Sequence, residues 1–169
     1  LRQIGQCLGP LVLGQPYKTE IVAYGPDMKT DAYRALNPLG KVPTIVHGDV
    51  VVTEGAAICT YLADAFPDAG LAPSSAARGA FYRWMFFGAG PVEAAVTAGA
   101  FGFDTQDDQA YARAGWGNLD AVTDALAGLL ADGRPYLLGD AFSALDVYLG
   151  SQIAFAQIFK TMPDRPAFG

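Results

Sequence analysis

The stretch from residue 37 to residue 66 constrains the fold of this chain more than any other part. Residues 37–40, Asn-Pro-Leu-Gly, have the chemistry of a turn, because proline fixes φ and glycine accepts positive φ. Two β-branched runs follow at residues 42–46 and 50–52, and residues 47–49 form a short polar loop between them. This pattern predicts a β-hairpin.

A helix is predicted to start directly after the hairpin, at residues 53–55, and to end before Pro67. Apolar residues at helical spacing form its predicted buried stripe: Ala57, Ile58, Tyr61, Leu62 and Ala65. The N-terminus of this helix would present unpaired N–H groups and a partial positive charge, which suit a carboxylate or a phosphate. Because Glu54 lies beside it and could hold a cationic amine, an amino-acid-like ligand would satisfy both features.

The order of these residues resembles the glutathione-binding half of the glutathione S-transferase family. The matching motifs are Asn-Pro-x-Gly-Lys-Val-Pro at residues 37–43 and Thr-Glu-x-x-Ala-Ile-x-x-Tyr-Leu at residues 53–62. In that family a thioredoxin-like domain precedes an all-helical domain. The resemblance therefore implies an α/β thioredoxin-like N-terminal domain at residues 1–66, a linker rich in Pro, Gly and Ser at 67–75, and an all-α C-terminal domain at 76–169.

The resemblance also assigns residues to a glutathione site. Val42, which precedes Pro43, would offer its backbone N–H and C=O to the cysteinyl part of glutathione. Glu54 and the residue after it would hold the γ-glutamyl end. The chain departs from the family here, because Gly55 replaces the usual Ser, so the backbone N–H is kept and a hydroxyl contact is lost. Lys41 lies where some members contact the glycyl carboxylate, and it is equally a solvated lysine.

Activation of the glutathione sulfur would fall to the opening stretch. Members of the family stabilise the thiolate with a Tyr, Ser or Cys near the end of the first strand. Cys7 is the one such group among residues 1–16, so it is the candidate catalytic residue. The alternative is that Cys7 is a buried, small apolar residue.

The opening stretch does not fit the family pattern completely. The first strand is expected within residues 1–6 and a parallel second strand at residues 19–23, which requires a crossover helix between them. Residues 7–18 contain Gly9-Pro10 and Gly14-Gln15-Pro16, which break helices. We therefore expect residues to be missing from this segment. Because the final helices of the family are absent from the sequence, we also expect residues to be missing from the C-terminal end. A protein that has lost its crossover helix is the alternative.

The first helix of the second domain is predicted at residues 76–87. In the family, this helix and the next line a hydrophobic substrate pocket and a dimer interface. Three aromatic residues are therefore the pocket candidates: Tyr82, Phe86 and Phe87. Aromatic residues at helical spacing are also usual in a core, so a packing role is the alternative.

Further helices are expected at residues 92–100 and at 109–130, the latter bent by its glycines. Ser143 and Asp146 have the spacing of a capping box, which predicts the start of another helix. The apolar run at residues 84–103 is interrupted by proline and glutamate, so two buried helices separated by a kink are favoured over a membrane span.

Composition limits the remaining functions. With 51% hydrophobic residues, the 169-residue chain can bury a sizeable core. A formal net charge of −6 and 11 scattered Lys and Arg residues argue against nucleic-acid binding. Cys7 and Cys59 match neither a zinc site nor a disulfide framework, so we expect no metal and a cytoplasmic location. His47, the single histidine, lies in a turn without an evident catalytic partner, and packing explains Cys59.

The resemblance thus implies a glutathione S-transferase of the bacterial cytosolic type. It would use glutathione as co-substrate, transfer its thiolate to an electrophilic small molecule in detoxification, and form a homodimer. The alternative is a transferase-like binding or regulatory protein without turnover, which Gly55 and the incomplete opening both permit.

Overall fold

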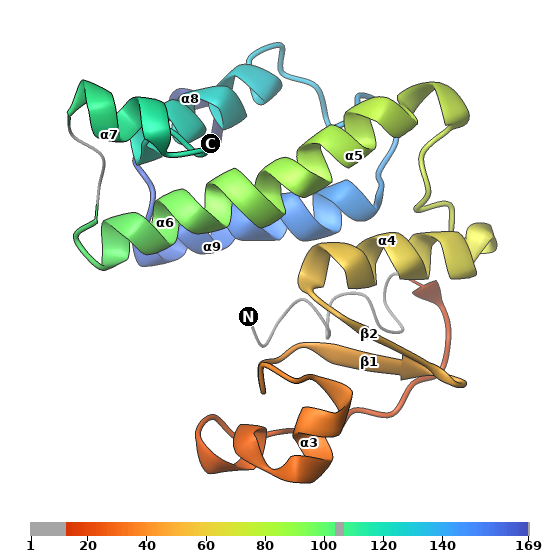
Figure 1. Cartoon of the computed structure of the whole chain (residues 1–169). Coiled ribbons are helices and arrows are strands. Elements are labelled where there is room, and N and C mark those ends of the chain that lie inside the picture. The colour runs from red at the N-terminus through yellow and green to blue at the C-terminus, as the bar shows by residue number, and fades with distance from the viewer. Residues whose placement is uncertain (1–12, 104–106, 169) are drawn as a thin grey trace. The chain divides into compact units, whose positions relative to one another are not determined.

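The computed structural model describes residues 13–103 and 107–168. The chain divides into two compact units, Leu1–Ala72 and Pro73–Gly169. The first contains a small sheet with helices, and the second is helical (Figure 1).

The first unit is built around the predicted hairpin. Its elements are η1 (Pro26–Lys29), α3 (Asp31–Leu36), β1 (Thr44–His47), β2 (Val50–Thr53), α4 (Gly55–Ala65) and η2 (Pro67–Ala69). The strands are antiparallel, and Thr44 pairs with Thr53 at the open end while His47 pairs with Val50 at the loop. Gly48 opens the two-residue loop with a φ of +60°, which glycine adopts at no steric cost. The hairpin prediction is confirmed.

Helix α4 buries a face that is rotated from the predicted one. Ile58, Cys59 and Ala63 are buried, whereas Ala57 is exposed. The predicted stripe was wrong in including Ala57, because a small alanine suits either face and does not mark the buried one. Cys59 is fully buried in the core of this unit, as the packing interpretation predicted.

His47 joins the hairpin to α4. Its Nδ1 atom lies 2.9 Å from the Tyr61 hydroxyl, and its ring contacts the rings of Tyr61 and Phe66. The expected turn position of His47 is corrected, since it is the last residue of β1 and packs against the helix.

One expectation for the opening of the first unit is wrong. Residues 19–23 are not a strand, and Ile21 is 80% exposed. The sheet of the described residues consists of β1 and β2, so this segment has no neighbour with which to form a ladder. Helix α3 is capped by Thr30, whose side-chain oxygen accepts from the Tyr33 N–H. The predicted first strand and Cys7 lie outside the described residues.

The second unit consists of helices and helical turns. They are η3 (Ser75–Ala77), α5 (Arg78–Phe87), η4 (Gly88–Val92), α6 (Glu93–Ala100), α7 (Asp108–Arg113), α8 (Leu119–Leu130), η5 (Asp146–Gly150), α9 (Ser151–Phe159) and η6 (Pro166–Phe168). Its largest fully buried side chains are Phe81, Leu126, Leu145 and Leu149.

Helices α5 and α6 are joined by η4 into one continuous helix (Figure 1). Pro91 lacks an N–H and would clash with the carbonyl four residues earlier in a regular α-helix. The π-helical turn Gly88–Val92 accommodates the proline, because its wider ring shifts the hydrogen-bond partners. The expected kink between two separate helices is thus a local widening of one helix. Within the described ranges, no helix has the length and apolar character needed to cross a membrane.

The long helix expected at residues 109–130 is wrong, because the segment contains two helices. α7 ends at Arg113, Gly117 adopts a φ of +70°, and α8 starts at Leu119. Asn118 caps α8, since its Oδ1 atom accepts from the Ala121 N–H at 2.8 Å. The cap and the glycine therefore break the helix, where propensity alone suggested only a bend.

The capping box at Ser143 and Asp146 is confirmed. The Asp146 Oδ2 atom accepts from the Ser143 N–H at 2.8 Å and from the Ser143 hydroxyl at 2.9 Å. Its Oδ1 atom accepts from the Leu137 N–H at 2.7 Å. One carboxylate therefore holds both the helix start and the preceding loop.

We expect Asp146→Ala to lower the free energy of unfolding by about 2–4 kcal/mol, because it removes three hydrogen bonds to one charged group. Chemical denaturation measures the change. Asp140→Ala, at an exposed carboxylate nearby, is the control and should change stability by less than about 0.5 kcal/mol. Similar losses in both variants would contradict the role of the capping box.

Gly88 gives a second test, since it lies where η4 approaches η5 and α9. A Cβ at this position would lie 2.9 Å from Gln152 Oε1 and 3.0 Å from the Tyr148 ring. We expect Gly88→Ala to destabilise the protein by about 1–3 kcal/mol. Gly90→Ala, two residues along the same turn with open space around it, should be neutral or stabilise by about 0.5–1 kcal/mol. Thermal unfolding of the two variants measures the difference. A Gly88→Ala variant as stable as the wild type would show that Gln152 and Tyr148 move to accommodate the added Cβ.

Candidate functional site: the open end of the hairpin

The register of the hairpin brings the predicted binding residues together. Because Thr44 pairs with Thr53, the residues just before β1 and just after β2 lie side by side. These are Val42-Pro43 on one side and Glu54-Gly55 on the other. Two segments more than ten residues apart in the sequence thus form one surface at the open end of the hairpin.

Val42 presents backbone groups without protein partners. Neither its N–H nor its C=O makes a hydrogen bond with any residue in the described part of the chain. Its bond to Pro43 is cis, and both residues are half-buried. Because backbone polar groups require partners when they leave water, Val42 can bind the backbone of an extended peptide.

Glu54 combines an exposed carboxylate with an unusual backbone. Its φ of +68° and ψ of 122° are rare for a residue other than glycine and cost about 1–3 kcal/mol. The Glu54 carbonyl accepts from the Ile58 N–H at 2.9 Å, in the first turn of α4. Its carboxylate makes no hydrogen bond or ion pair with a described residue, so it is available to a ligand. This conformation was not predicted from the sequence.

Gly55 is the first residue of α4. The N–H groups of the first turn have no partners inside the helix and carry the positive end of its dipole. A negative carboxylate and a partly positive helix end therefore lie one residue apart. This arrangement suits a zwitterion, which carries an amine and a carboxylate on one carbon.

Lys41 leads into this surface from the other side. Its side chain is exposed, and its amine forms no ion pair with the described residues. Its carbonyl oxygen accepts from the Tyr33 hydroxyl at 2.7 Å and from Asn37 Nδ2 at 2.8 Å. Asn37 belongs to the motif at residues 37–43, but neither residue was predicted to hold the Lys41 carbonyl. An Asn before the turn proline was the available signal, because Asn side chains commonly bond to the backbone of their own turn.

The predicted pocket residues lie in the helical unit, on α5. Tyr82 is 40% exposed and Phe86 is 72% exposed. Phe87 is half-buried and packs edge-on against Trp84, with ring centres 5.2 Å apart. The packing alternative therefore describes Phe87, whereas Tyr82 and Phe86 present aromatic surface to solvent.

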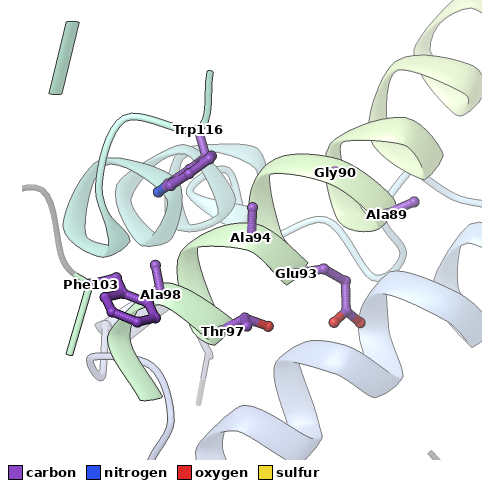
Figure 2. Close-up of a pocket in the computed structure, with 8 residues that line it drawn as sticks. All are labelled: Ala89, Gly90, Glu93, Ala94, Thr97, Ala98, Phe103 and Trp116. Atoms are coloured by element: carbon purple, nitrogen blue, oxygen red, sulfur yellow. The ribbon is translucent and has the colours of Figure 1, made fainter. Parts of the chain in front are cut away.

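A shallow groove of about 590 Å³ lies along the continuation of the same helix (Figure 2). Its lining is mostly small or aromatic: Ala89, Gly90, Glu93, Ala94, Thr97, Ala98, Phe103 and Trp116. Phe103 and Trp116 lie toward the Ala98 end, as Figure 2 shows. Tyr82, Phe86 and Phe87 are not part of this lining.

Glu93 is the charged residue of the groove, and it is held by a neighbouring helix. Its Oε1 atom accepts from Gln152 Nε2 at 2.9 Å. The groove is therefore an apolar surface with one fixed carboxylate at its edge.

The shifted pKa values belong to ion pairs of the helical unit. Hydrogen bonds from Arg134 lower the pKa of Asp132 to about 2. Hydrogen bonds to Asp124 and Asp120 raise the pKa of Arg165. No group of three or more His, Cys, Asp or Glu residues among residues 13–103 and 107–168 could hold a metal ion.

Comparisons with known proteins agree with this geometry. The family model described as glutathione S-transferase, N-terminal domain, matches residues 11–65, and the corresponding C-terminal domain model matches residues 108–166. Over 44 residues the chain is 48% identical to glutathione S-transferase 1 of Dianthus caryophyllus. This match covers 26% of the chain and spans only 20% of that relative's length.

Two solved structures extend the comparison to nearly the whole chain. The theta class glutathione S-transferase from Xanthomonas axonopodis pv. citri, solved with glutathione bound, is 30% identical with a TM-score of 0.66. The match covers 98% of this chain and 82% of that one. A holo maleyl pyruvate isomerase, a bacterial zeta class member, is 26% identical with a TM-score of 0.64, over 94% of this chain and 79% of the other.

The predicted fold class is confirmed, since a thioredoxin-like α/β N-terminal domain is followed by an all-α domain. Both family models occur in the expected order, and a relative of 30% identity matches over most of both chains. The chain therefore belongs to the glutathione S-transferase family.

Proposed function

We propose that this protein binds glutathione at the open end of the hairpin and transfers its thiolate to an electrophilic small molecule. The observation that carries the proposal is the unpartnered Val42 backbone beside the available Glu54 carboxylate and the N-terminus of α4. The relative from Xanthomonas axonopodis pv. citri, solved with glutathione bound, supports the choice of ligand. The proposal includes a glutathione-binding domain at residues 1–66, a linker at 67–75 and a helical domain at 76–169.

Each part of glutathione finds a complementary group. The γ-glutamyl amine would pair with the Glu54 carboxylate, and the carboxylate on the same carbon would accept from the Gly55 N–H. The cysteinyl N–H and C=O would pair with the C=O and N–H of Val42, next to Pro43, as neighbouring antiparallel strands do. The glycyl carboxylate would lie within reach of the Lys41 amine. Because one end of the ligand is a zwitterion and the other end carries a carboxylate alone, this surface also fixes the direction of the ligand.

The transfer step needs the glutathione sulfur as a thiolate. The thiolate electron pair forms a bond to a carbon of the electrophile, and the bond from that carbon to the leaving group breaks, with its electron pair departing on the leaving group. The described residues would bind and orient the peptide in this step. Cys7 stays the candidate for stabilising the thiolate, and it lies outside the described residues.

The electrophile would bind to the exposed stripe of the α5–α6 helix. Tyr82 and Phe86 lie one turn apart on this stripe, with Phe87 beside them. Ala89 and Gly90 continue it into the groove. An exposed aromatic and small-residue surface favours apolar, planar molecules. The homodimer, the cytoplasmic location and the role in detoxification stay predictions from the family.

A second candidate function is glutathione binding without turnover, as in a regulatory protein. Gly55 favours it, because the site lacks the hydroxyl that the family usually supplies to the γ-glutamyl carboxylate. Binding and turnover must therefore be measured separately.

We expect calorimetry to detect binding of reduced glutathione to the wild-type protein. Glu54→Gln should weaken that binding about tenfold, because it replaces an ion pair with a neutral hydrogen bond. Asp49→Asn, at the closed end of the same hairpin, is the matched control and should bind like the wild type. If the wild-type protein does not bind glutathione, the proposal is contradicted.

An assay that monitors the conjugation of glutathione to an aryl chloride by absorbance distinguishes the two candidate functions. We expect product formation to depend on protein concentration and to fall with Glu54→Gln at subsaturating glutathione. If the protein binds glutathione but forms no product with several classes of electrophile, the result would favour the regulatory alternative.

Gly55→Ser is expected to restore the missing contact. The hydroxyl adds a hydrogen bond to a charged carboxylate, so glutathione should bind about tenfold tighter than to Gly55→Ala. Gly55→Ala is the matched control, because it adds the Cβ without the hydroxyl. Equal affinities of the two variants would place the γ-glutamyl carboxylate elsewhere.

A further inference from the structure

We propose that Tyr33 and Asn37 are positioning residues for glutathione, because they aim the backbone N–H of Val42 at the ligand without contacting it. This inference rests on the proposed function and extends it to residues of α3 and of the loop that follows it.

The Lys41 carbonyl is the point on which both side chains converge. The Tyr33 hydroxyl donates to it at 2.7 Å, and Asn37 Nδ2 donates at 2.8 Å. The Lys41–Val42 peptide bond is trans, and a trans peptide group is planar, with its C=O and N–H pointing in opposite directions. Holding the Lys41 carbonyl toward Tyr33 and Asn37 therefore turns the Val42 N–H away from them.

The two positioning residues are themselves fixed. Asn37 is buried, with 3% exposure, and its Oδ1 atom accepts from the Leu39 N–H at 3.1 Å. Its backbone N–H donates to the Tyr33 carbonyl at 2.9 Å. The Tyr33 hydroxyl also lies 3.1 Å from Thr44 Oγ1, at the start of β1. The Lys41 carbonyl is thus held between a helix end and a strand start.

The preceding peptide groups are oriented in the same way. Lys29 Nζ donates to the Leu39 carbonyl at 3.0 Å and to the Gly40 carbonyl at 2.9 Å. Gly40 adopts a φ of +57°, and a Cβ there would collide with the Met28 carbonyl oxygen. Three successive carbonyls of the loop therefore bond to side chains of the first unit.

This orientation matters for binding because it is made before the ligand arrives. A backbone donor that is free to rotate loses conformational entropy on binding, and a donor held in place loses less. Removal of the Tyr33 hydroxyl leaves the Lys41 carbonyl with one of its two donors, so the Val42 N–H becomes less well oriented.

Tyr33→Phe tests the inference, since it removes one hydroxyl and keeps the ring. We expect the Kd for reduced glutathione to rise about three- to tenfold. Tyr61→Phe is the matched control, because it removes the hydroxyl that bonds to His47 in the same unit, and its Kd should stay that of the wild type. Equal affinity of Tyr33→Phe and wild type would overturn the inference and leave the proposed function standing.

Thr44→Val separates the two partners of the Tyr33 hydroxyl. It removes the contact to β1 and keeps the bond to Lys41, so we expect little change in Kd. If Thr44→Val weakens binding as much as Tyr33→Phe does, Tyr33 acts through the strand, and the inference is wrong.

Amide NMR gives a readout that a general loss of stability would not reproduce. In the wild type, glutathione should shift the Val42 amide signal. In Tyr33→Phe at saturating glutathione, the Val42 shift should shrink while the Gly55 shift is retained. If the wild-type protein binds glutathione and its Val42 amide signal does not shift, the inference is overturned, even if the variant fails to fold. Absence of any wild-type binding would instead overturn the proposed function, and the inference with it.

Discussion

The buried amide of Asn37 is the interaction on which the candidate site depends. Its oxygen accepts from the Leu39 N–H, its nitrogen donates to the Lys41 carbonyl, and its backbone bonds to Tyr33 and Gly40. A buried amide that satisfies both of its side-chain atoms costs little, whereas one with a missing partner would cost about 1–3 kcal/mol. The loop that leads to Val42 is therefore determined by hydrogen bonds, since its apolar side chains, Pro38 and Leu39, are exposed and do not hold it by apolar packing.

The hairpin and the start of α4 could be predicted from the sequence because their signals are local. Gly48 marks the loop, the valines mark the strands, and Pro67 marks the end of the helix. The same holds for the box at Ser143 and Asp146, whose partners lie three residues apart. The binding residues themselves were located through family resemblance, and the register of the hairpin then gave their proximity a physical basis.

Other features could not be predicted, because they depend on contacts between distant residues or on competing local preferences. The strand expected at residues 19–23 needs a neighbour to bond to, and propensity does not report whether that neighbour is in place. The break between α7 and α8 follows from the Asn118 cap, which outweighs the helix propensity of the residues around it. The bonds from Lys29 to the loop span ten and eleven residues, beyond any sequence periodicity.

The π-helical turn η4 has a consequence for the helix that contains it. A π-turn amounts to one extra residue in an α-helix, and each α-helical residue turns the chain by about 100°. The extra residue sets the phase between α5 and α6, and it therefore determines which residues of α6 face the same side as the exposed Tyr82 and Phe86 of α5. Deletion of a single residue from η4 would rotate every side chain of α6 by roughly a quarter turn relative to α5. Which side chains line the groove therefore depends on the number of residues in η4 as well as on the sequence of α6.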